Sequence, residues 1–133
     1  MSRSGYIEDC EDNWASIRYR GAVKAAIRGK RGQDFLKEIV AALDALPEPK
    51  LIGDSLVTPS GDYCTLGAVG RLRGMKLDEI DPEDIETVAA KFGVAEALAR
   101  EIVYENDEAG WYKDGPEARF KRMRNWAQVH IKN

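Results

Sequence analysis

The sequence predicts a single, mainly α-helical domain with a small β component (mainly α, of α+β class), and three observations support this. Its 133 residues suit one domain. Hydrophobic residues make up 44% of the chain and charged residues 32%, a composition that buries a core and does not suit a disordered chain. Apolar residues recur at helical spacing and predict about six helical segments. We therefore expect residues 1–133 to form one mostly helical domain, after an irregular lead-in over residues 1–12.

Amphipathic segments at 14–28 and 33–46 predict the first two helices. The residues between them, GKRG at 29–32, contain two glycines that favour a turn. Because this connection is short, we expect the two helices to form an antiparallel hairpin.

The region 51–66 departs from this helical pattern. Two β-prone runs flank the turn sequence PSGD at 59–62, which predicts a small β-hairpin. A short helix is predicted next, over 66–72. Its glycines, Gly67 and Gly70, predict close packing against another backbone.

Three more helices are predicted in the second half of the chain. The sequence DPED at 81–84 favours a helix start, so the first of them covers 81–92, and Gly93 ends it. The second covers 94–105. The third begins at Pro116 and continues to about Ile131.

Charge is unevenly distributed along the chain, although the formal net charge is only -3. Residues 14–33 hold six basic residues and no acids, and residues 77–109 hold eleven acids and two basic residues. Residues 113–133 again hold six basic residues, against two acids. These segments either complement one another in the fold or form a localised basic surface that the net charge conceals.

The localised basic surface is the first candidate binding site. Arg20, Lys24 and Arg28 follow one another at steps of four on the first predicted helix. Lys30 and Arg31 lie in the glycine turn, where two cations and the start of a helix favour an anion. The turn lacks the GxxxxGK[ST] spacing of a phosphate-binding loop.

The second candidate is a pair of aromatic residues. Trp111 and Tyr112 lie in a predicted loop over 107–115, where we expect exposure and contact with a partner. Trp14 and Trp126 lie on predicted helices, and we expect both in the core.

The residues disfavour hydrolytic and metal chemistry. The one histidine, His130, has no evident serine or cysteine partner, and no HExxH, cysteine-cluster or Walker A motif is present. Cys10 and Cys64 share no CxxC spacing, so we expect two reduced thiols. We therefore expect no catalytic residue, no cofactor and no metal.

Two further patterns have structural explanations. The carboxylates of Glu101, Glu105, Asp107 and Glu108 are expected to form a solvated acidic face. The segment around Gly93 has the spacing of a helix-turn-helix, but its second helix would present carboxylates to the phosphates of DNA. A helix pair that turns for packing reasons explains the same residues.

The chain shows no signal-peptide pattern and no apolar stretch near the ~18–20 residues that span a bilayer. We therefore expect a cytoplasmic protein without membrane contact.

Several stretches carry a resemblance to known sequences: MSRSGY at 1–6, RGAV at 20–23, IRGKRGQ at 27–33, FL at 35–36, ALDALP at 42–47, LGAVG at 66–70 and YENDE at 104–108. Together they resemble a group of small hypothetical proteins of tailed phages and prophages, over most of the chain. The resemblance implies context alone, a phage or prophage gene product in a bacterial cytoplasm. It carries no activity or catalytic residue onto these positions.

We therefore expect a non-enzymatic accessory protein that binds a host or phage protein. One form of this hypothesis is that the protein inhibits a host system. The alternative is a nucleic-acid-binding protein that uses the first helix and the 29–32 turn, with salt-dependent affinity. In that alternative the last helix adds Arg119, Lys121, Arg122 and Arg124.

Overall fold

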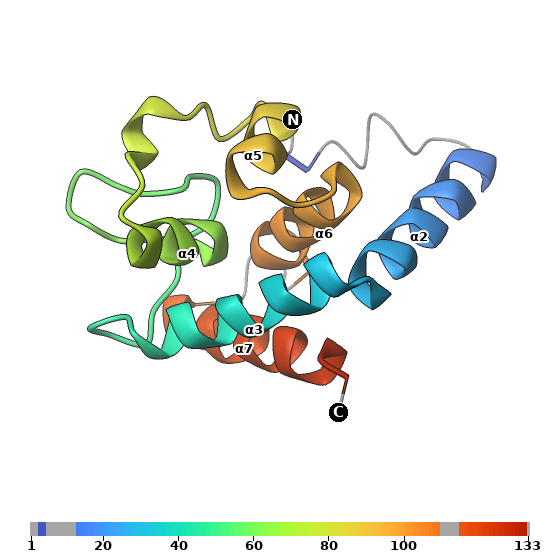
Figure 1. Cartoon of the computed structure of the whole chain (residues 1–133). Coiled ribbons are helices and arrows are strands. Elements are labelled where there is room, and N and C mark those ends of the chain that lie inside the picture. Colours follow the sequence, from blue (N-terminus) through green and yellow to red (C-terminus); the bar gives the residue numbers. More distant parts are fainter. Residues whose placement is uncertain (1–2, 5–12, 110–114, 133) are drawn as a thin grey trace.

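The computed structural model describes residues 3–4, 13–109 and 115–132, and these residues form a mainly helical fold without strands (Figure 1). The helices within this part of the chain are α2 (Asn13–Arg28), α3 (Lys30–Asp44), α4 (Thr65–Arg73), the 3₁₀ helix η1 (Leu77–Glu79), α5 (Ile85–Phe92), α6 (Glu96–Asp107) and α7 (Pro116–His130). None of them has the length and apolarity needed to cross a membrane.

Helix α3 forms one side of the core and lies antiparallel to α7. Its buried residues recur at helical spacing and include Leu36, Ile39 and Leu43, which are almost fully excluded from solvent. Gln33, near the start of α3, donates from Nε2 to the carbonyl oxygen of His130 at the end of α7 (3.0 Å). The antiparallel partner of α3 is therefore α7.

Helix α6 is the central helix of the fold. It packs against α2, α4, α5 and α7. Its residues Leu98, Ala99, Ile102 and Val103 are each at most 1% exposed. Because α6 is buried on several sides, its contacts fix the position of the helices around it, including α2.

The expected hairpin of the first two helices is wrong. Helix α2 ends at Arg28 and α3 begins at Lys30, so Gly29 is the whole connection. The amide of Gly29 still donates to the carbonyl oxygen of Ala25 (3.2 Å), and one residue is too short to reverse the chain. In Figure 1, α3 continues across the molecule away from α2.

The expected β-hairpin over 51–66 is also wrong. The two arms meet in one antiparallel bridge between Val57 and Tyr63, and a turn with Gly61 at φ 85° joins them. Cys64 already caps α4, because its Sγ accepts from the amide of Gly67 (3.3 Å). The returning arm therefore enters a helix before a ladder can form.

Helix α5 begins later than the DPED sequence predicts. Asp81 accepts from the amide of Glu83 (3.0 Å), which closes a turn instead of opening a helix. The N-cap is Asp84, whose carboxylate accepts from the amide (3.2 Å) and hydroxyl (2.8 Å) of Thr87. The predicted end at Gly93 is confirmed, with φ 73° at that glycine.

The close packing predicted for the glycines of α4 is confirmed for backbone contact at Gly67. A Cβ at this position would lie 1.9 Å from the carbonyl oxygen of Leu56. At Gly70 the neighbour is a side chain, because a Cβ there would lie 2.4 Å from Cδ2 of Leu77.

Candidate macromolecule-binding surface

The basic stripe predicted on the first helix is present on α2 and borders a pocket. Arg20, Lys24 and Arg28 are exposed and line one side of a pocket of about 290 Å³. Glu101 of α6 and His130 of α7 line its other side. The stripe is therefore brought together with the C-terminal end of the chain.

A buried carboxylate is one of the groups that line this basic pocket. Glu101 is 5% exposed, and Arg20 Nη1 lies 3.8 Å from its Oε2. On the next turn of α6, burial and the neighbouring Glu101 raise the pKa of Glu105, against the charges of Arg122, His130 and Arg20. The pocket thus combines exposed cations with the buried carboxylate of Glu101, and Glu105 lies one turn further along α6.

His130 is held by α7 itself. Its Nδ1 donates to the carbonyl oxygen of Trp126 (2.7 Å), and the two rings lie 5.0 Å apart at their centroids. Because this bond occupies Nδ1, Nε2 is the ring nitrogen that remains for a ligand in the pocket.

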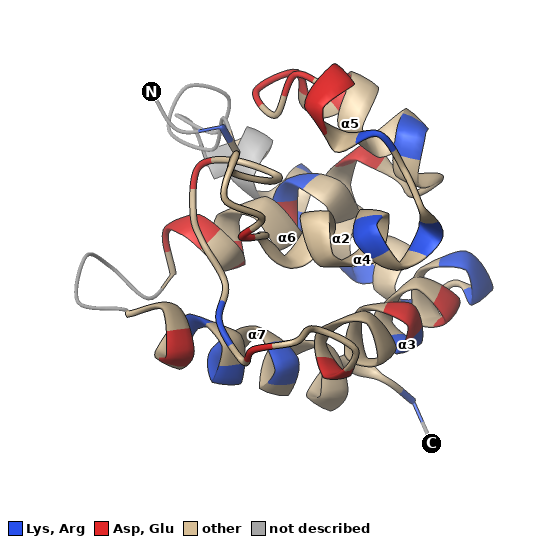
Figure 2. Ribbon diagram, turned by 90° about the vertical axis from the view of Figure 1, so that its left-hand side faces the viewer, with Lys and Arg blue, Asp and Glu red and all other residues tan. Residues whose placement is uncertain are grey.

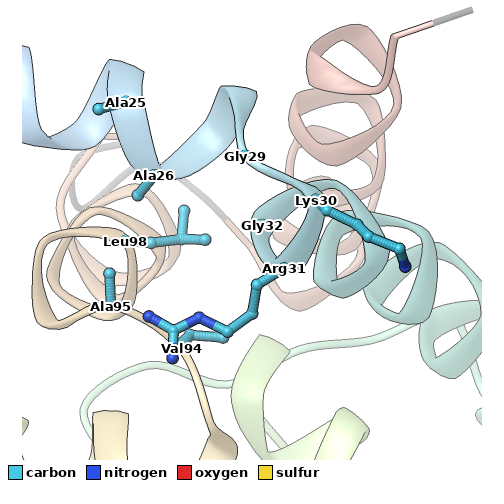
Figure 3. Close-up of a pocket in the computed structure, with 9 residues that line it drawn as sticks. All are labelled: Ala25, Ala26, Gly29, Lys30, Arg31, Gly32, Val94, Ala95 and Leu98. Carbon is cyan, nitrogen blue, oxygen red and sulfur yellow. The ribbon is translucent and has the colours of Figure 1, made fainter.

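The 29–32 segment is the start of α3 and not a four-residue turn. Lys30 Nζ pairs with Asp34 Oδ2 at 2.7 Å. Arg31 makes no ion pair with any residue that the structure describes. A second pocket, of about 260 Å³, lies beside Arg31 between α2, α3 and the start of α6 (Figure 3).

The solvent face of α2 adds an apolar end to this surface. Trp14 and Ile17 are 72% and 61% exposed, so the prediction that Trp14 lies in the core is wrong. The prediction for Trp126 is confirmed, because that side chain is 9% exposed. At 100° per residue, positions 14 and 17 lie on the face of α2 opposite the buried Val23.

The orientation of α2 follows from its contacts with α6. Val23 is buried, and the guanidinium of Arg100 lies over the ring of Tyr19, 5.3 Å from its centroid. Arg100 is itself 5% exposed and donates to the backbone of Ser4 (2.6 Å). These contacts turn the cationic and apolar face of α2 outward.

The cations of the last helix do not extend the basic surface as the nucleic-acid alternative expected. Arg119 donates to the carbonyl oxygens of Asn106 (2.8 Å) and Leu51 (3.2 Å). Arg122 donates to the carbonyl oxygen of Glu105. Arg124 forms a two-point pair with Asp44, at 2.7 and 2.9 Å. Lys121 is exposed and forms no ion pair with the described residues.

Acidic residues gather elsewhere on the molecule. Figure 2 shows acidic ribbon on the segment that leads into α5. Asp81, Glu83, Asp84 and Glu86 in this segment are all exposed. These exposed acids thus lie on an element other than α2.

The carboxylates at the end of α6 do not form the expected solvated acidic face. Arg3 pairs with Asp107, and the hydroxyl of Ser4 donates to Glu108 Oε2 (2.5 Å). Burial raises the pKa of Asp107, but the hydrogen bonds and charge of Arg3 outweigh it, so that pKa lies below its ordinary value. Sequence reasoning missed this cluster, because nothing in the spacing links residues 3–4 to α6.

The helix-turn-helix interpretation is disfavoured. The helix–Gly93–helix element exists, but the second helix is α6, whose buried residues include Arg100, Glu101 and Asn106. A helix covered on several sides does not enter a DNA groove.

The described residues contain no group of three or more His, Cys, Asp or Glu side chains placed to hold a metal. Cys64 is buried and has a free thiol. Cys10, Trp111 and Tyr112 lie outside the described residues.

Comparison of the chain with protein-family models, curated proteins and solved structures found no match in any of the three.

Proposed function

We propose that this chain is a non-enzymatic phage or prophage accessory protein of the bacterial cytoplasm that binds an acidic surface of a host or phage protein through α2. The single observation that carries the proposal is the solvent face of α2. It combines exposed aromatic and aliphatic side chains, Trp14 and Ile17, with exposed cations, and the helix contains no acid.

The apolar end of α2 supplies the anchor that such an interface needs. Single exposed apolar side chains are ordinary on a protein surface, whereas adjacent ones mark contact sites. Trp and Arg are the residue types most enriched among those that dominate binding energy. Trp14 and Ile17 are one helical turn apart, so one partner surface covers both.

The cations of α2 supply orientation and partner choice. Arg18, Lys24 and Arg28 are exposed and make no ion pair with the residues that the structure describes. Their charge is therefore available to a partner. Opposite charge on that partner speeds association and excludes basic surfaces.

A nucleic-acid ligand is the second candidate, and the same unpaired cations favour it. Four phosphate contacts, from Arg18, Lys24, Arg28 and Arg31, predict a salt dependence with a slope of roughly -3 to -4 in log–log form. The inward-turned arginines of α7 and the apolar start of α2 favour the protein partner instead.

The test compares three forms of the chain in affinity capture from bacterial lysate, with and without nuclease treatment. The first is the wild type, and the second is the double variant Lys24→Glu/Arg28→Glu. The third, Lys76→Glu/Lys91→Glu, reverses two exposed cations elsewhere and changes the net charge equally.

The wild type and the control variant are expected to retain one stoichiometric acidic protein that the α2 variant loses, with or without nuclease. Equal recovery by all three forms would contradict the role of α2. Recovery that disappears after nuclease treatment would replace the protein partner with nucleic acid.

A further inference from the structure

We propose that the pocket beside Arg31 is a subsite for an apolar side chain next to a carboxylate, supplied by an acidic segment of the protein partner. The inference rests on the proposed function and adds the chemistry of the segment that α2 binds.

The pocket is a small apolar hollow. Ala25 and Ala26 of α2 line one wall, and Val94, Ala95 and Leu98 line the other. Val94 and Leu98 are 6% and 1% exposed, so they belong to the core and form a fixed wall. Its volume is about 260 Å³, which leaves room for an aliphatic side chain.

Arg31 provides the one charge directed across this hollow. In Figure 3 its side chain extends from the start of α3 toward Val94 and Ala95, whereas Lys30 points away from the pocket. Lys30 is already paired with Asp34. Arg31 has no ion-pair partner among the described residues, and its planar fork matches a carboxylate at two points.

The shape of the hollow depends on glycine at position 32. A Cβ there would lie 1.9 Å from the carbonyl oxygen of Ala26, so glycine is needed for the close approach of α3 to α2. A Cβ on Gly29 would meet the carbonyl oxygens of Ala25 and Ala26 at 3.7 and 3.8 Å. A single guanidinium beside apolar walls matches a singly charged carboxylate next to an aliphatic side chain.

The hollow is continuous with the surface of α2 that carries the proposed function. Ala25 lines the pocket and is also exposed on the same face as Trp14. A segment that covers Trp14 and Ile17 and follows α2 for about 16 Å reaches Ala25, which lines the pocket with Arg31 of α3.

The test uses short peptides of known sequence and amide chemical shifts of the full chain. The probes are acetyl-Gly-Leu-Glu-Gly-amide, its Leu-Gln counterpart, its Gly-Glu counterpart and inorganic phosphate. The variants are Arg31→Ala, the matched control Lys30→Ala, and Ala95→Leu, which fills the hollow. The dispersion of the spectrum reports whether each variant is folded.

The Leu-Glu peptide is expected to shift the amide signals of Arg31, Ala95 and Leu98 saturably. The Leu-Gln and Gly-Glu peptides are expected to bind the wild type roughly tenfold more weakly than the Leu-Glu peptide. The Arg31→Ala variant is expected to bind the Leu-Glu peptide roughly tenfold more weakly than the wild type does. Lys30→Ala is expected to leave binding of the Leu-Glu peptide unchanged, and Ala95→Leu is expected to abolish it.

Three results would overturn the inference: no saturable shift by the Leu-Glu peptide, equal binding of phosphate at the same amides, or equal loss in Lys30→Ala and Arg31→Ala. Its failure is separable from that of the proposed function. If Lys24→Glu/Arg28→Glu loses the captured partner while Arg31→Ala and Ala95→Leu retain it, the surface of α2 stands and the subsite does not.

Discussion

Arg3 forms a two-point ion pair with Asp107, 104 positions further along the chain, with Nε–Oδ2 at 2.5 Å and Nη2–Oδ1 at 2.8 Å. The two side chains are 2% and 4% exposed. The pair joins residues 3–4 to the end of α6, next to the contact of Arg100 with Ser4. The central helix that orients α2 is thus tied to the N-terminal residues by charge.

Replacing Asp107 by Asn is expected to destabilise the fold by about 3–5 kcal/mol, because it leaves the buried guanidinium of Arg3 without its counter-charge. Urea denaturation measures the free energy of unfolding. Asp34→Asn is the control, since it removes one partner of the exposed pair with Lys30, and its free energy should hardly change. Equal effects of the two substitutions would contradict the burial of the Arg3–Asp107 pair.

The same pair predicts a loss of stability at acid pH. The pKa of Asp107 is lower in the folded chain than in the unfolded one, so its contribution is present above the unfolded pKa. That contribution is lost as the pH falls through the folded pKa. The gap in unfolding free energy between wild type and Asp107→Asn should therefore narrow as the pH falls, and a constant gap would contradict it.

For Glu105 we expect the opposite dependence of stability on pH. Burial and the Glu101 charge raise its pKa in the folded chain, so the folded state binds this proton more tightly and ionisation opposes folding. Glu105→Gln is expected to stabilise the fold at neutral pH, and the gain should disappear below the unfolded pKa. Thermal unfolding from acid to neutral pH measures this, and a gain independent of pH would exclude the ionisation as its cause.

Two glycines are expected to respond oppositely to alanine. Gly67→Ala should destabilise the fold, because the new Cβ would lie 1.9 Å from the carbonyl oxygen of Leu56. Gly21→Ala in α2 meets nothing within 4 Å and should stabilise it by roughly 0.5–1 kcal/mol through helix propensity. Unfolding midpoints measure both effects. A Gly67→Ala variant as stable as the wild type would contradict the close packing of α4 on Leu56.

Asn106 joins three segments and should be sensitive to replacement. Its Oδ1 accepts from the amide (3.1 Å) and hydroxyl (2.8 Å) of Thr65, and its Nδ2 donates to the carbonyl oxygen of Ile52 (2.9 Å). Asn106→Leu is expected to cost about 2–4 kcal/mol, because buried polar groups lose their partners. Asn125→Leu, at an exposed position of α7, is the control and should change the unfolding free energy little.

Much of the helical architecture was predictable from local pattern. The apolar spacing of Leu36, Ile39 and Leu43 predicts the buried face of α3, and the glycine at position 93 predicts the end of α5. The start of α5 was not predictable in this way, because Asp81 closes a turn where a helix cap was expected. Local pattern does not distinguish a turn that precedes a helix from the helix start itself.

The basic surface was predictable only where its residues share one helix. Arg20, Lys24 and Arg28 lie together because a spacing of four places them on one side of α2. The inward turn of Arg119 and Arg122 was not predictable, because it depends on the end of α6 lying beside α7. The exposure of Trp14 likewise depends on which side of α2 meets α6.

The most direct test of the account is the acetylation of lysines in the free chain and in its complex with the captured protein, read by mass spectrometry. Lys24 is expected to be protected in the complex, and Lys76 and Lys91 to react as they do in the free chain. Unchanged reactivity of Lys24, with protection at Lys76 or Lys91, would contradict binding through α2.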